Sequence, residues 1–168
     1  MNLNLWAKTC LTVYRYLDRL AEAIDGLVDR QALNSYYSNF TNYSVMDIAD
    51  KIIELSERKV KLINLKVLIE KTLENLDVLD SRILIEKYIH NDKGEEIAKR
   101  NNLSLRTYFR KQNSAENAFT AFMASKGFSE EKLSKYLAGE SWIMEVYKKF
   151  QIESGISEEE LTLDERAI

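Results

Sequence analysis

The first 27 residues carry the pattern that most restricts the fold, because their apolar side chains recur at alternating steps of three and four. The series consists of Leu3, Trp6, Cys10, Val13, Leu17, Leu20, Ile24 and Leu27. This spacing keeps one side of an α-helix apolar and is typical of a coiled-coil seam. We therefore predict a helix over about Asn4–Asn34. Its seam can pack against the second long helix of the same chain, or it can form a homodimer or capture another partner.

Composition favours helices along the rest of the chain as well. The 168 residues include no proline and only five glycines, the two residues that most disfavour helix interiors. Apolar residues make up 45% and charged residues 30%, values that are ordinary for a globular protein able to bury a core. We expect an all-α fold.

A second long helix is predicted over Ser44–Leu76, folding back on the first as an antiparallel hairpin. Its apolar positions follow a heptad repeat that Lys59 and Lys66 interrupt. The uncharged segment Ser35–Ser44 should be an ordered connection with its aromatic side chains against the bundle. Those aromatic residues are Tyr36, Tyr37, Phe40 and Tyr43.

The remaining sequence divides into shorter predicted helices. After a break at Asp77–Asp80, we expect helices over Ser81–His90, Glu95–Arg100 and Ser104–Ser125. Gly127 is placed to end the last of these, and two further helices are predicted over 129–137 and 141–152. These elements suggest three domains, a helical hairpin (1–76), a central unit (77–125) and a C-terminal cap with an acidic tail (126–168).

The central unit has the residue types of a helix-turn-helix. A small residue lies where two helices must approach closely, apolar residues flank the turn, and an asparagine tolerant of positive φ lies within it. A serine follows as N-cap, and a tyrosine four residues later should point inward. In order, these residues are Ile97, Ala98, Asn102, Leu103, Ser104 and Tyr108.

The same segment is locally basic, which predicts duplex DNA as a partner although the chain has a net charge of −3. Five Lys or Arg and no acid lie between Lys99 and Asn113. Arg106 and Arg110 are the candidates for base contacts, because a guanidinium can donate two hydrogen bonds to guanine. The full set of candidate DNA-binding residues is Lys99, Arg100, Ser104, Leu105, Arg106, Thr107, Arg110 and Lys111. Within it, Lys99, Arg100, Thr107 and Lys111 are assigned to phosphates.

These motifs resemble the C-terminal promoter-binding region of bacterial sigma factors. They are more similar still to the sigma-like regulators of late operons in phages of Gram-positive bacteria. The residues that carry the resemblance are Lys87-Tyr88-Ile89, Glu96-Ile97-Ala98, Ser104, Arg106, Thr107 and Arg110. The resemblance spans about Ile48–Phe122 and implies a sequence-specific transcriptional regulator with a sigma-like helix-turn-helix. The chain departs from the family pattern at Asn101, Asn102 and Lys111, where an apolar residue, a glycine and an apolar residue are usual.

Few residues are suited to other chemistry. His90 and Cys10 are each the only residue of their type, so most metal sites and Cys-His catalysis are excluded. The five glycines are isolated and form no phosphate-binding loop. We therefore expect neither enzymatic activity nor a cofactor or metal. No membrane-spanning run or signal-peptide pattern is found, so we expect a cytoplasmic protein.

The charge distribution leaves two other partners open. Six acidic side chains lie between Glu153 and Ile168, against one basic residue, Arg166. This tail is a candidate surface for binding RNA polymerase. The main alternative to DNA binding is a helical protein–protein interaction module. Its contacts would be made by the apolar seam of the first helix and by the apolar side of the segment Trp142–Phe150.

Overall fold

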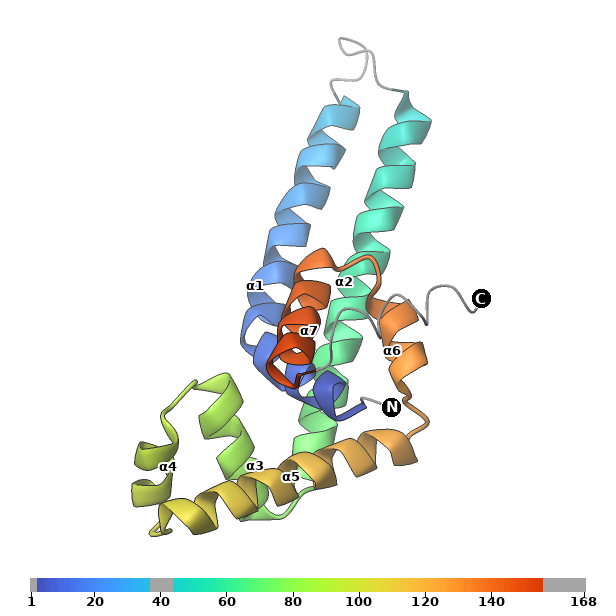
Figure 1. The fold of residues 1–168 in the computed structure, drawn as a ribbon. Coiled ribbons are helices and arrows are strands. Elements are labelled where there is room, and N and C mark those ends of the chain that lie inside the picture. The colour runs from blue at the N-terminus through green and yellow to red at the C-terminus, as the bar shows by residue number, and fades with distance from the viewer. Residues whose placement is uncertain (1–2, 37–43, 156–168) are drawn as a thin grey trace. The chain divides into compact units, whose positions relative to one another are not determined.

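The protein is described by a computed structural model that covers residues 3–36 and 44–155 (Figure 1). The fold is all-α, as the sequence predicted, and the described residues contain no strand. They divide into two compact units. One contains Arg15–Leu68, and the other contains the described residues of Met1–Tyr14 and Ile69–Ile168. These units do not follow the predicted boundaries at residues 76 and 125, because both long helices contribute residues to each unit.

The Arg15–Leu68 unit is an antiparallel hairpin made from α1 (Leu3–Tyr36) and α2 (Val45–Glu74). Lys59 Nζ lies 2.6 Å from Asp25 Oδ1, and Lys66 Nζ lies 2.7 Å from Asp18 Oδ1. From the first ion pair to the second, the α2 residue number rises by seven and the α1 residue number falls by seven. The two helices are therefore antiparallel, with a register set by these pairs. The two lysines that interrupt the heptad repeat of α2 are thus its charged links to α1.

Most of the predicted α1 seam is buried within the single chain. Trp6, Cys10, Val13, Leu17 and Ile24 are each at most 3% exposed. This burial matches the first of the two alternatives, in which the seam packs inside the monomer. A homodimer through the same seam would require α1 to leave these contacts.

The other unit begins with the first turns of α1. The Trp6 ring stacks on Tyr147 of α7 (Ser141–Glu153), with ring centroids 4.3 Å apart. The Tyr147 hydroxyl donates a 2.7 Å hydrogen bond to Glu130 in α6 (Glu130–Leu137). Burial raises the pKa of the Cys10 thiol to about 12, so this cysteine is unreactive near neutral pH.

The central helices of this unit are α3 (Val78–Leu84), η2 (Ile85–Ile89), α4 (Gly94–Arg100) and α5 (Leu105–Ser125). The predicted helix Ser81–His90 is therefore an α-helical segment that continues as one turn of π-helix. π-Helical turns are rare in proteins, and those that occur are often found at functional sites. His90 lies at the exposed end of that turn, as predicted from the sequence.

Predicted helix ends are confirmed at two further positions. Gly127 has a positive φ of 78° and follows α5, and Ser129 Oγ caps α6 by accepting from the Lys132 amide. The predicted packing of Tyr37, Phe40 and Tyr43, and the whole of the acidic tail beyond Gly155, lie outside the described residues. Within the described ranges, no helix combines the length and apolar character needed to cross a membrane.

Candidate nucleic-acid interface

A small apolar core joins α3, α4 and α5. Ile83, Ile97 and Tyr108 are fully buried in it, and Ala98 is 4% exposed. Leu79 and Leu103 pack against this group and complete it. Each of the three helices and the turn contributes a side chain, so their relative orientation is fixed by packing. The sequence predicted the contributions of Ile97, Ala98, Leu103 and Tyr108.

The turn between α4 and α5 has the geometry predicted for it. Asn102 adopts a φ of 53°, and its amide donates to the Lys99 carbonyl at 3.2 Å. The Leu103 amide donates to the Ala98 carbonyl at 2.8 Å. This pair of bonds is a Schellman motif, which satisfies the last carbonyls of α4 and reverses the chain. Asparagine suits this position because it tolerates left-handed geometry better than most residues.

Ser104 begins α5 as its N-cap. Its Oγ accepts a 3.2 Å hydrogen bond from the Thr107 amide and lies 2.8 Å from Thr107 Oγ1. The capping bond satisfies one of the amides that a helix start leaves without a partner. Ser104 and Thr107 were both predicted to contact DNA, and here their side chains are engaged with each other at the start of the helix.

Gly94 lies against the Tyr108 ring at its Cε1 atom, a contact that the sequence analysis did not identify. A Cβ atom added at Gly94 would lie 2.7 Å from Tyr108 Cε1. That distance is too short for two carbon atoms without a shift of the ring or the backbone. The first residue of α4 is therefore glycine because the inward-pointing tyrosine of α5 occupies the space beside it.

The other side of the first turns of α5 faces solvent. Arg106 and Arg110 are exposed, Leu105 is 42% exposed and Phe109 is 53% exposed. Lys99 of α4 is also exposed. Among the described residues, no acidic side chain forms an ion pair with Lys99, Arg106 or Arg110. The face that the sequence assigned to DNA is thus accessible, and Phe109 adds a large apolar side chain that was not predicted there.

Two of the predicted phosphate ligands already have acidic partners. Arg100 Nη2 lies 2.5 Å from Asp92 Oδ2, and Arg100 Nη1 lies 3.5 Å from Glu86 Oε1. The hydrogen bond to Asp92 raises the pKa of this guanidinium. Lys111 Nζ lies 4.0 Å from Asp80 Oδ1. These two cations hold the helices together, which weakens their assignment to phosphate relative to Lys99, Arg106 and Arg110.

Asn101 links the turn to η2. Its Nδ2 donates 2.9 Å hydrogen bonds to Glu86 Oε2 and to the Ile97 carbonyl. These two hydrogen bonds form a polar link between the turn and η2. Glu86, which also lies near Arg100, joins η2 to both the end of α4 and the turn.

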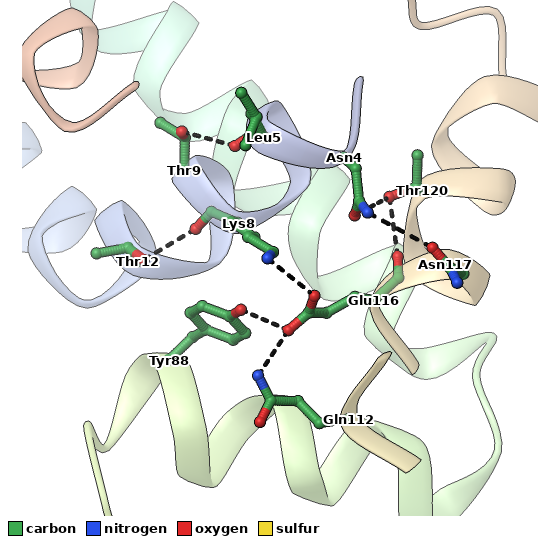
Figure 2. Close-up of polar contacts among 10 residues, drawn as sticks. All are labelled: Asn4, Leu5, Lys8, Thr9, Thr12, Tyr88, Gln112, Glu116, Asn117 and Thr120. Atoms are coloured by element: carbon green, nitrogen blue, oxygen red, sulfur yellow. Dashed lines mark hydrogen bonds and ion pairs between the residues drawn. The ribbon is translucent and has the colours of Figure 1, made fainter. Parts of the chain in front are cut away.

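A buried carboxylate anchors the second half of α5 (Figure 2). Glu116 is 2% exposed, and Oε1 accepts from the Tyr88 hydroxyl at 2.6 Å and from Gln112 Nε2 at 2.8 Å. Its Oε2 lies 3.2 Å from Lys8 Nζ of α1. Several donors thus compensate for the cost of burying the charge. Asn4 adds hydrogen bonds to the next turn of α5, at Asn117 and Thr120.

Tyr88 lies in the π-helical turn, and Glu116 is the partner of its hydroxyl. Burial raises the pKa of Tyr88, and the adjacent Glu116 carboxylate raises it further because a phenolate there would face a negative charge. The tyrosine therefore stays protonated and donates to Glu116. Through this bond the π-helical turn is attached to α5.

Comparisons with known proteins give no further guide, since no family model, curated protein or solved structure matches this chain. Within residues 3–36 and 44–155, no group of three or more His, Cys, Asp or Glu side chains is arranged to hold a metal ion. The geometry of α4, the turn and α5 therefore provides the main basis for a functional assignment.

Proposed function

We propose that this protein is a non-enzymatic, sequence-specific binder of duplex DNA that acts in transcriptional control. The observation that carries the proposal is the pair Arg106 and Arg110, which lie one turn apart on the exposed face at the start of α5. Helices of this kind enter the major groove with their first turns against the base edges. Arginine side chains in that position can read guanine through two hydrogen bonds.

Rigid support of these arginines favours the proposal. α5 is capped by Ser104, held by the Tyr108 core and attached to α4 by a Schellman turn. A reading helix needs such support because a base contact tolerates little displacement. We assign Lys99, at the end of α4, to a phosphate contact that would fix the register.

The exposed apolar side chains on the same face fit this function. Leu105 and Phe109 are four residues apart and lie beside Arg106 and Arg110. An apolar side chain in the major groove can contact the methyl group of thymine. We therefore expect a binding site that combines guanine and thymine, read by arginine and by Leu105 or Phe109 respectively.

The experiment is a duplex-DNA binding assay at low salt, with target sequences selected from a random pool. Arg106→Ala should weaken binding by about 1–3 kcal/mol and relax specificity at one base pair. The double variant Arg106→Ala with Arg110→Ala should lose selective binding. Its matched control is Lys148→Ala with Lys149→Ala, which removes two exposed positive charges from α7.

Salt titration separates reading from simple charge attraction. Wild-type affinity should fall steeply as salt rises, because contacts to phosphates release counterions. The control variant should retain the selected sequence, whereas the Arg106 and Arg110 variant should not. Equal binding by wild type and that double variant would contradict the proposal, and no binding even at low salt would favour the interaction-module alternative. A pull-down with and without the acidic tail tests RNA polymerase as a partner.

A further inference from the structure

α2 carries a second apolar stripe in addition to the one that it buries. The stripe consists of Met46, Ile53, Val60, Ile63 and Val67, which are 71%, 56%, 54%, 42% and 46% exposed. Four of these residues are seven positions apart, and Ile63 lies between the last two as the intermediate position of a heptad. Single exposed apolar residues are ordinary, but a continuous row over this length of helix marks an interaction surface.

The stripe lies away from α1. The side of α2 that packs in the hairpin is formed by Ile48, Leu55 and Leu62, which are each at most 6% exposed. Each stripe residue Met46, Ile53 and Val60 lies two positions before one of these. Residues two positions apart in a helix are separated by about 200° around its axis. The stripe therefore lies on the side of α2 opposite to the one that packs in the hairpin.

Small and branched residues along the stripe suit a close helix partner. Ala49 and Ser56 fill the intermediate heptad positions between Met46, Ile53 and Val60. Small side chains there allow a second helix to approach, while the branched side chains of Ile53 and Val60 act as knobs. The row from Met46 to Val67 is about 30 Å long, which is enough for a two-helix contact.

The charges of α2 indicate which helix fits and in which direction. Its first part, Val45–Glu57, has acidic residues at 47, 50, 54 and 57 against a single lysine at 51. The following part, Arg58–Leu68, has basic residues at 58, 59, 61 and 66 and no acid. Lys59 and Lys66 pair with Asp25 and Asp18 of α1, so this part of the hairpin keeps an excess of two positive charges. A parallel copy of α2 would place acid against acid, whereas an antiparallel copy places the acidic part of one helix against the basic part of the other.

We propose that the stripe binds a second copy of this chain, with the two α2 helices antiparallel about a two-fold axis. In this arrangement Ile53 of one copy packs against Ile63 of the other, and Val60 packs against Ser56. The surface is self-complementary in shape and in charge, as an isologous dimer interface requires. The contact does not involve the face of α5 assigned to DNA, so the two proposals succeed or fail separately.

The first test measures the molar mass of the full chain in solution by light scattering. Wild type should have twice the chain mass of 19.6 kDa, and Val60→Glu should have the mass of one chain. Leu33→Glu on α1 is the matched control, because Leu33 is 60% exposed and lies outside the stripe, and it should remain dimeric. A circular dichroism spectrum verifies that each variant keeps its helices, and Ile63→Glu serves as a second stripe variant.

The second test measures the direction of the helices by disulfide cross-linking. The natural Cys10 is fully buried, so engineered surface cysteines report alone. A mixture of Ala49→Cys and Val67→Cys chains should form mixed cross-linked dimers, because the same register places position 49 of one copy opposite position 67 of the other, and both side chains are exposed. Neither variant should cross-link with itself. A monomeric wild type, or a Val60→Glu variant that remains dimeric, would overturn the proposed interface. Self-cross-linking of Ala49→Cys would overturn its antiparallel direction.

Discussion

The two ends of α5 differ in their exposure to solvent. At the N-terminal end, Arg106, Phe109 and Arg110 are exposed to solvent. At the C-terminal end, Phe119 and Met123 are fully buried and Glu116 is 2% exposed. The same 21-residue helix is therefore a surface at one end and part of a core at the other.

This difference shows how a cationic surface can be held rigidly without being buried. A reading residue must remain solvated until DNA replaces the water, so it cannot contribute much packing energy of its own. The buried half of α5 supplies that energy instead, through Phe119 and through the bonds from Lys8 and Tyr88 to Glu116. Because the helix is continuous, fixing one end positions the other.

The largest expected effect is the contrast between two phenylalanines on this helix. Phe119→Ala should lower the free energy of unfolding by about 3–5 kcal/mol, because it leaves a cavity in the core. Phe109→Ala removes the same atoms from a side chain that is 53% exposed, so its cost in stability should be much smaller. Urea denaturation of both variants measures the contrast, and equal losses would contradict the division of α5 into two ends.

A smaller effect is expected where the N-terminal end meets α4. Gly94→Ala would bring a Cβ atom to 2.7 Å from the Tyr108 ring, and such overpacking typically costs about 1–3 kcal/mol. Gly139→Ala is the matched control, because no heavy atom lies within 4 Å of its Cβ position. In thermal unfolding, the midpoint temperature of Gly94→Ala should be well below that of the control variant. A Gly94 variant as stable as wild type would show that Tyr108 does not occupy this space.

Loss of the helix cap should have a still smaller effect. Ser104→Ala removes the bond that the Thr107 amide donates to Ser104 Oγ, and such N-cap substitutions cost about 1 kcal/mol. Ser104→Asp is the matched comparison, because aspartate also caps helices and should retain most of the stability. If both variants lost equal stability in urea, the side chain of Ser104 would not act as a cap.

The smallest expected effect on stability comes from the ionisation of the Tyr88 hydroxyl, and it is seen only at alkaline pH. Its pKa is raised by folding, so protonation favours the native state and the resulting stability is fully present below about pH 10. That stability should be lost as pH rises above this value. Tyr108 and Tyr147 have raised pKa values as well and should act in the same direction. Tyr88→Phe should therefore show a shallower loss of stability in alkaline urea titrations than wild type, and an unchanged slope would contradict this assignment.

Local signals in the sequence predicted the turn and its surroundings well. The positive φ of Asn102, the N-cap at Ser104 and the inward direction of Tyr108 were all predicted correctly. They could be predicted because each depends on only a few neighbouring residues. Helix periodicity predicted the hairpin for the same reason. The π-helical turn at Ile85–Ile89 was not predicted, since it has no distinct periodic pattern over five residues.

Contacts between distant residues could not be predicted from local patterns. Lys111 was assigned to phosphate, but it lies near Asp80. Arg100, at the end of α4, pairs with Asp92, which precedes that helix. Glu116 would be expected on a surface, because a carboxylate is rarely buried without partners. Its burial depends on Lys8, more than 100 positions earlier, which no sequence window includes.

The central claim is that the exposed end of α5 reads DNA while the buried end supports it. The most direct measurement is an NMR titration of amide chemical shifts with a duplex selected from the random pool. Shifts should concentrate in Leu105–Lys111 and at Lys99, leaving the amides around Phe119 nearly unchanged. Binding that shifts only α7 or the α2 stripe, or a titration that shifts no amide at low salt, would contradict the claim.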